Sequence, residues 1–169
     1  MYQPYPTGAA EPEPRSGAQP PSSIRNAVKL MYAGAAVSVI VIIVAIVTIG
    51  SARSAVHSAF PQYSADRVRR AAVGLIAYEV VVQVITIGLW LWMAWANKAG
   101  KSWARIVSSV LFGLNTLFLL VSLSRPHASF GLALLVVIWL IGLGAVFFLW
   151  RRESSAYYAA AKARSGTAG

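Results

Sequence analysis

Four long apolar stretches constrain this chain more than any other feature of its sequence. They cover about residues 30–50, 71–96, 106–123 and 129–150 of a 169-residue chain. An α-helix rises about 1.5 Å per residue and the hydrocarbon layer is about 30 Å thick, so a spanning helix needs roughly 17–25 apolar residues. All four stretches meet this requirement. The sequence therefore predicts an all-α membrane protein with four transmembrane helices in an antiparallel bundle.

The composition agrees with a lipid environment. Hydrophobic residues make up 57% of the chain and charged residues 12%, whereas soluble domains average roughly 25% charged residues. The net charge of +10 comes from Lys and Arg that flank the apolar stretches, which is typical of membrane topology. We therefore expect a lipid bilayer around the chain and no nucleic acid partner. Because the chain has no cysteine, it has no disulfide bond and no thiol nucleophile.

The remaining segments divide the chain into three parts. Residues 1–23 hold six of the eight prolines and are expected to form a disordered, Pro-rich cytoplasmic tail. The transmembrane domain covers residues 24–152, and residues 153–169 form an Ala-rich basic tail that is expected to prolong the last helix. The first apolar stretch is longer than the core of a signal peptide, which has 7–15 residues, so we expect it to remain in the chain.

Polar and helix-breaking residues predict where the helices begin and end. Ser23 and Ser64 are expected to cap the first two helices, with Asp66 in the first turn of the second. Gly100 and Pro126 are expected to interrupt the two short connections that follow. Short connections make consecutive spans antiparallel neighbours.

The distribution of Lys and Arg predicts the orientation. Ten lie on one side: Arg15, Arg25, Lys29, Lys98, Lys101, Arg105, Arg151, Arg152, Lys162 and Arg164. Five lie on the other side: Arg53, Arg67, Arg69, Arg70 and Arg125. The excess places both termini in the cytoplasm, although the four arginines of the first outer connection oppose this bias. An interfacial aromatic belt on the inner side agrees with it and comprises Trp90, Trp92, Trp95, Trp103 and Trp150.

Glu79 is the one acidic residue within a predicted span. Ionisable residues in a membrane usually face other helices and have functional roles. At 100° per residue, Glu79 shares one narrow stripe with Gln83, Thr86, Trp90 and Asn97. We expect this stripe to face protein rather than lipid.

The third span carries a matching line of residues: Arg105, Ser108, Phe112, Asn115, Leu119 and Ser122. In an antiparallel pair Gln83 comes level with Asn115 and Thr116, which predicts a hydrogen bond between them. Ser38 of the first span reaches the same level. The candidate intramembrane polar site therefore comprises Glu79, Gln83, Thr86, Asn115, Thr116 and Ser38, with Arg125 as the nearest cation.

This polar site has two interpretations. Its side chains either join the helices, at perhaps 0.6 kcal/mol each, or form a site that handles protons or cations. A single carboxylate without a second acid or a broken helix is weak support for transport. Small residues also favour close helix approach, either within the bundle or between copies: Gly34 with Ser38, and Gly142 with Gly144.

Catalytic and metal-binding patterns are not found in the sequence. His57, His127 and Asp66 are too few for an assured metal site. No Ser, His and Asp set and no paired carboxylates occur at usable spacing. We expect no enzyme activity, no cofactor and no bound metal.

Two segments resemble a known group of proteins. SIRNAVKLMYAGAAVS at residues 23–38 and NKAGKSWARIVSSVLFGLN at residues 97–115 are similar to small four-span integral membrane proteins of actinobacteria that carry a Pro-rich N-terminal tail. The resemblance covers nearly the whole chain and implies a bacterial plasma membrane, but no activity and no site residues.

The expected function is that of a non-catalytic assembly or regulatory partner, joined to another membrane protein or to further copies of itself. The alternative is an oligomeric small-solute or proton-coupled transporter that uses Glu79.

Overall fold

The computed structural model describes residues 19–124 and 129–166. Within these residues it consists of six helices and has no strand. The helices are α1 (Ser22–Val47), α2 (Ile49–Ala59), α3 (Ala65–Lys98), α4 (Ser102–Leu123), α5 (Ser129–Leu149) and α6 (Arg152–Gly166). Four of them, α1, α3, α4 and α5, are long and apolar enough to cross a membrane. The predicted all-α membrane fold is confirmed.

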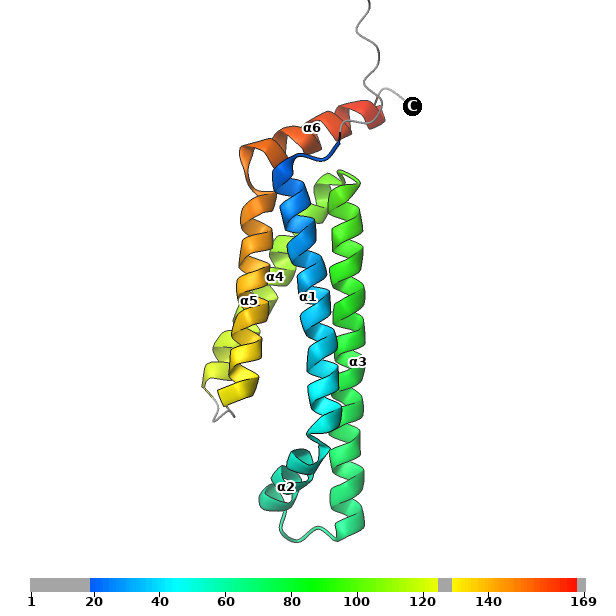
Figure 1. The fold of residues 1–169 in the computed structure, drawn as a ribbon, viewed down its shortest axis with the longest axis vertical. Coiled ribbons are helices and arrows are strands. Elements are labelled where there is room, and N and C mark those ends of the chain that lie inside the picture. Colours follow the sequence, from blue (N-terminus) through cyan, green and yellow to red (C-terminus); the bar gives the residue numbers. More distant parts are fainter. Residues whose placement is uncertain (1–18, 125–128, 167–169) are drawn as a thin grey trace, which may run out of the picture.

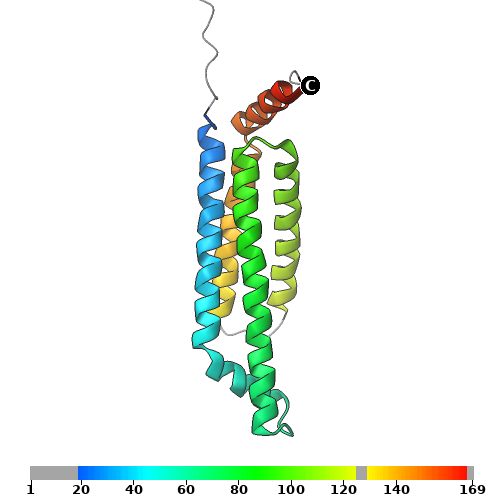
Figure 2. The same ribbon diagram turned by 90° about the vertical axis from the view of Figure 1, so that its right-hand side faces the viewer.

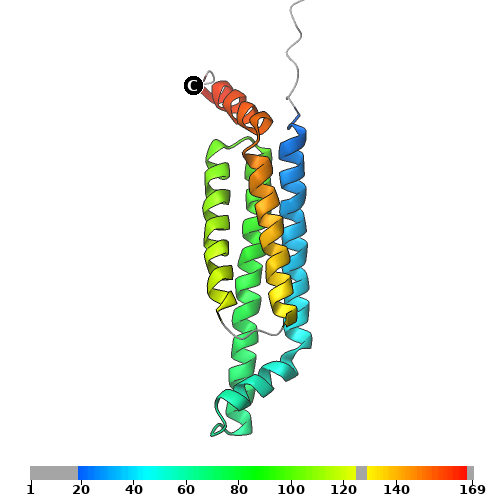
Figure 3. The same cartoon turned by 90° about the vertical axis from the view of Figure 1, so that its left-hand side faces the viewer.

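The four long helices run antiparallel to one another along the chain (Figure 1). Helix α1 packs against both α3 and α5, and α4 packs mainly against α5. Figures 2 and 3 show the same order around the bundle from its two sides. Contacts between α3 and α4 are few, although only a short turn joins them. The shortness of a connection therefore fixes the direction of these helices but not how closely they pack.

Helix α3 is longer than a bilayer requires. Its 34 residues correspond to about 51 Å of helix, against about 30 Å of hydrocarbon. The first turns of α3 extend beyond the end of α1, where α2 packs against them (Figure 1). A small apolar cluster of Val56, Val68 and Ala72 joins the two helices. The first span was predicted to reach Gly50, but α1 ends at Val47 and α2 begins at Ile49.

Ser64 and Gly100 lie at helix ends as predicted, whereas Ser23 does not. Ser64 precedes α3 as expected, without a side-chain capping bond, and Asp66 lies in the first turn. Gly100 ends α3 with a φ of 71°, and the Lys101 N–H donates to the Ala96 carbonyl at 3.1 Å, which is the Schellman arrangement. The prediction for Ser23 is wrong. Pro21 occupies the N-cap position, so Ser23 lies inside α1 and is buried.

The C-terminal tail does not prolong the last span. Helix α5 ends at Leu149, and α6 begins at Arg152 and lies across one end of the bundle (Figures 1 and 3). This end also contains the start of α1 and the turn between α3 and α4. The predicted tail of residues 1–23 lies outside the described residues except for positions 19–23, of which Ser22 and Ser23 are helical. Arg125, Pro126 and His127 also lie outside them.

Small residues make their close contacts within this bundle. A Cβ atom on Gly34 would lie 2.6 Å from Trp90 Cε2, so the indole ring of α3 rests directly on the backbone of α1. A Cβ on Gly142 would lie 3.0 Å from Phe112, and one on Gly144 would lie 3.0 Å from Leu30. Of the two alternatives left open by the sequence, the structure shows packing within one chain.

Candidate functional site

The predicted polar stripe of α3 faces the interior of the bundle. Asn97 is fully buried, and Glu79, Gln83, Thr86 and Trp90 are half-buried. The opposite face is exposed, with Val81, Val84 and Ile85 each 57% exposed. On α4, the matching line places Ser108, Leu119 and Ser122 in buried positions. The expectation that the stripe of α3 faces protein is confirmed.

The predicted hydrogen bond from Gln83 to Asn115 or Thr116 is wrong. Gln83 Nε2 instead donates to Glu79 Oε1 of its own helix at 2.8 Å. This bond is local because residues four apart in a helix are neighbours on its surface. The Gln83 carbonyl oxygen, Oε1, is buried and has no hydrogen-bond partner among the described residues. Contacts between α3 and α4 are few, which agrees with the missing bond.

The other members of the predicted site also bond within their own helices. Ser38 is fully buried and donates to the Gly34 carbonyl at 3.0 Å. Thr86 donates to Val82 at 2.9 Å, and Thr116 donates to Phe112 at 2.9 Å. Thr116 also accepts the indole N–H of Trp139 from α5 at 2.9 Å. Five of the six side chains, all except Asn115, therefore form hydrogen bonds, and no single polar network joins them within the described residues.

Two of the six, Thr86 and Asn115, line a cavity of about 330 Å³. The cavity lies between α3 and α4, with residues of α1 and α5 completing its wall. Most of its lining is apolar, and Ser108 is its third polar side chain. In the part of the chain that the structure describes, the Asn115 amide forms no hydrogen bond. Small-molecule pockets have volumes of roughly 300–1,000 Å³ and a few polar groups in an apolar wall, so this cavity is large enough to be a binding site.

Trp90 takes part in this cavity rather than in an interfacial belt. Its ring is half-buried against Gly34 and lines the cavity. The other four tryptophans of the predicted belt are exposed: Trp92, Trp95, Trp103 and Trp150. Trp92 and Trp103 contact each other, with ring centroids 5.3 Å apart.

A buried polar network at the α6 end was not foreseen from the sequence. The Tyr158 hydroxyl of α6 donates to Asn97 Oδ1 at 2.7 Å. Asn97 Nδ2 in turn donates to the Met93 carbonyl at 2.8 Å and to Ser108 Oγ at 3.2 Å. Tyr158 is 2% exposed, and burial raises the pKa of its phenol well above the ordinary value of about 10. The phenol therefore remains a hydrogen-bond donor at neutral pH.

Further contacts hold α6 on the bundle. Arg105 Nη1 donates to Ser155 Oγ at 3.1 Å, and its guanidinium lies over the rings of Trp150, at 4.4 Å, and Tyr158, at 5.4 Å. Ser154 Oγ hydrogen-bonds Ser23 Oγ at 2.9 Å, and both serines are buried. Residues 154 and 158, one turn apart, define the docking face. The spacing of four residues between Ser154 and Tyr158 is visible in the sequence. Because neither residue is aliphatic, the sequence alone does not identify this face of α6 as buried.

No group of three or more His, Asp or Glu side chains that could hold a metal ion gathers among residues 19–124 and 129–166. Compared with known protein families, with curated proteins and with solved structures, the chain matches none. The chemistry of its own residues is therefore the basis for a functional proposal.

Proposed function

We propose that this chain is a non-catalytic assembly or regulatory partner in the bacterial plasma membrane. In this proposal it binds a transmembrane helix of another membrane protein at the open side between α3 and α4. The excess of Lys and Arg at the α6 end supports a cytoplasmic location for both termini. The resemblance to four-span proteins of actinobacteria supports the choice of membrane.

Two incompletely paired amide side chains beside the cavity, those of Asn115 and Gln83, are the observation that carries this proposal. Asn115 lines the cavity, and Gln83 lies one helical turn beyond Thr86, with its buried Oε1 unpaired. A buried polar group without a partner costs about 1–3 kcal/mol, and lipid tails offer no hydrogen-bond donor. A polar side chain on a neighbouring transmembrane helix can donate this hydrogen bond. The cavity between α3 and α4 therefore fits a protein helix better than it fits bulk lipid.

Site-specific photocrosslinking in cells tests this proposal. A photoreactive residue is placed at Leu114 or at the less exposed Leu89, which both line the cavity, and in controls at Leu117 and Val81, which lie outside it; Leu117 is matched to Leu114, since both are 59% exposed. We expect one membrane protein to be captured from the two cavity positions only. Capture should fall when Asn115 is changed to Leu. Equal capture from the control positions, or lipid adducts alone, would contradict the proposal.

The Glu79 and Gln83 pair favours a second candidate function, which is proton- or cation-coupled transport by an oligomer. A carboxylate within an apolar span is costly and usually has a functional role. Among the described residues, Glu79 accepts one hydrogen bond, from the Gln83 amide. Crosslinks between copies of this chain alone would favour this candidate. Flux into liposomes should then be lost in Glu79→Gln, which preserves the hydrogen bond to Gln83. Unchanged flux in that variant would indicate a structural Glu79.

A further inference from the structure

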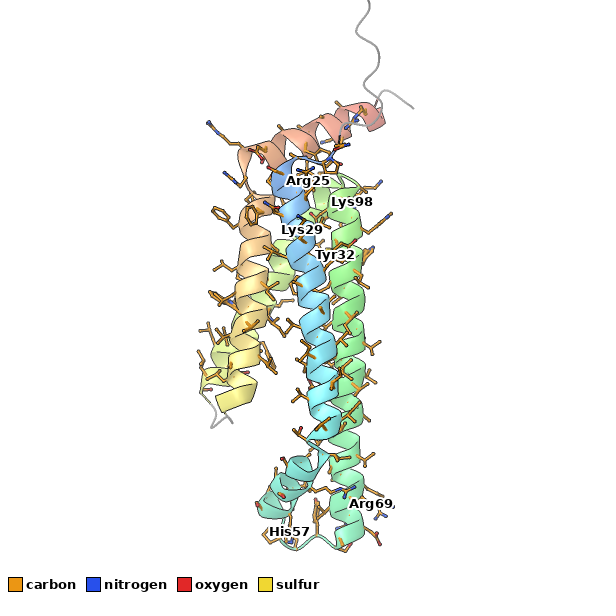
Figure 4. The ribbon with its side chains drawn as sticks, in the orientation of Figure 1. Arg25, Lys29, Tyr32, His57, Arg69 and Lys98 are labelled. Atoms are coloured by element: carbon orange, nitrogen blue, oxygen red, sulfur yellow. The ribbon has the colours of Figure 1, made fainter. Side chains whose placement is uncertain are left out.

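A basic cleft lies at the end of the molecule opposite α6. It is a hollow of about 490 Å³ between α2 and the first turns of α3. Arg53 and His57 line it from α2, and Tyr63, Asp66 and Arg69 line it from the loop and from α3. Figure 4 shows His57 and Arg69 at this end, far from Arg25, Lys29 and Lys98 at the other. The apolar contact between Val56 and Val68 fixes the two helices relative to each other.

The charge of this segment is not explained by membrane topology. Residues 49–70 contain four arginines, Arg53, Arg67, Arg69 and Arg70, and one acid, Asp66, which gives a net charge of +3. The predicted outer side of a membrane protein normally has few such residues. Arg67 lies over the Tyr63 ring at 5.1 Å. Within the described residues, Arg53 and Arg69 form no hydrogen bond and no ion pair, so both guanidinium groups are free to bind an anion.

The position of the cleft along α3 matches the headgroup layer. The apolar part of α3 begins at Ala71, directly after Arg69 and Arg70, and extends to Ala96. It measures about 39 Å, which crosses the hydrocarbon layer of about 30 Å with some tilt. Arg69 lies about 3 Å beyond Ala71, where the headgroup layer of roughly 5–8 Å begins. Val73 and Leu75, directly below, are 48% and 56% exposed. They offer an apolar surface to the acyl chains of a lipid whose headgroup occupies the cleft.

We propose that the cleft between α2 and α3 binds the phosphate group of an anionic phospholipid, with Arg53 and Arg69 as its charged donors. Guanidinium groups form paired, charge-assisted hydrogen bonds with phosphate oxygens. His57 and Tyr63 lie beside them and supply further donors. Asp66 is the single acid in the lining, so the two arginines give the cleft a positive balance. This site is independent of the proposed function, because it lies at the other side of the bilayer from α6 and outside the α3 and α4 cavity.

Lipid selectivity of the whole chain tests the proposal. The purified protein is placed in nanodiscs of equal phosphatidylglycerol and phosphatidylcholine, and the lipids that it retains are counted by native mass spectrometry. Arg69→Gln is compared with Arg70→Gln, which removes the same charge from the neighbouring residue outside the cleft. We expect Arg69→Gln to lower the preference for phosphatidylglycerol at least tenfold, as expected when a hydrogen bond to a charged group is lost, and Arg70→Gln to lower it at most about fivefold, the effect of one cation at a membrane surface.

Each other outcome overturns the proposal in a different way. Equal losses in both variants would indicate diffuse attraction to anionic lipid rather than a site. If the wild-type protein shows no preference for phosphatidylglycerol, an anionic phospholipid is not the ligand of the cleft. Binding of inorganic phosphate that depends on Arg69, without lipid preference, would assign the cleft to a soluble anion. Circular dichroism checks that each variant is folded, and Arg53→Gln provides a second variant on the other wall of the cleft.

Discussion

At the scale of single residues, the contact between Tyr158 and Asn97 is a buried polar interaction of the α6 end. Their side chains are 2% and 0% exposed, and the hydroxyl donates to Asn97 Oδ1 at 2.7 Å. Tyr158→Phe keeps the ring but leaves this acceptor unpaired, so we expect a loss of about 1–2 kcal/mol in the free energy of unfolding. Tyr157→Phe is the matched control, because its hydroxyl donates to an exposed carbonyl, that of Lys98. Titration with a denaturing detergent measures the free energy of unfolding of both variants. Equal losses would show that the buried bond of Tyr158 stabilises the fold no more than the exposed bond of Tyr157.

The same phenol predicts a response to high pH. Burial raises the pKa of Tyr158 above the ordinary value of about 10, while the nearby Arg105 opposes this shift. The unfolded chain therefore loses this proton first, and binds fewer protons than the folded chain above that pH. The contribution of Tyr158 is complete below pH of about 10 and declines as the pH rises towards its folded pKa. Unfolding free energies measured across this range should fall less steeply for Tyr158→Phe than for the wild type.

Gly34 sets the distance between α1 and α3. A methyl group there would lie 2.6 Å from Trp90 Cε2, so we expect Gly34→Ala to cost about 1–3 kcal/mol by overpacking. Gly88→Ala is the control, since its Cβ meets nothing within 4 Å. The double variant with Trp90→Leu should recover part of the loss because it removes the colliding ring. A neutral Gly34→Ala would show that the ring moves aside freely.

At the scale of the helices, α6 is a docked element rather than a free tail. Ser154, which is fully buried, and Tyr158 form its contact face one turn apart. Ser154→Leu should displace α6 and expose Asn97, because the pocket beside Ser23 has no room for a larger side chain. Hydrogen exchange of the amides of α6 should then rise at least tenfold. Ala159→Leu, on the exposed face of α6, should leave exchange unchanged, and a rise in both variants would argue against specific docking.

The long apolar helices could be predicted from the sequence, whereas the contacts between helices could not. The apolar length of a segment is a property of that segment alone, so the four spans and the inward stripe of Glu79 and Gln83 could be read from the sequence. The bond between these two residues was also predictable from their spacing of four. The cavity beside Asn115 was not, because it depends on how Trp90 packs against Gly34 of α1 and Phe112 against Gly142 of α5. Nor was the docking of α6, whose face is marked by serine and tyrosine instead of by apolar residues.

At the scale of the whole molecule, the two ends differ in how their charge is used. At the α6 end, Arg105 is half-buried and lies over aromatic rings in the network that closes the bundle. At the α2 end, the guanidinium groups of Arg53 and Arg69 face an open hollow. Rigid packing at one end and an open basic cleft at the other fit a protein that is anchored by lipid on one side. In the proposed function, a partner helix binds along the side of the bundle, between α3 and α4.

The orientation of the molecule is the last prediction, and the absence of cysteine from the chain makes it simple to test. Single cysteines are introduced at Ser58 of α2 and at Ala160 of α6, both exposed and at opposite ends. Since cytoplasmic segments carry the excess of Lys and Arg, a membrane-impermeant maleimide should label Ser58→Cys in intact cells. It should label Ala160→Cys only after the membrane is permeabilised. The reverse pattern would place the arginines of α2 and α3 inside the cell, where the topology rule alone would account for them. The predicted pattern places those arginines outside the cell, where the topology rule does not account for them and a bound anionic ligand would.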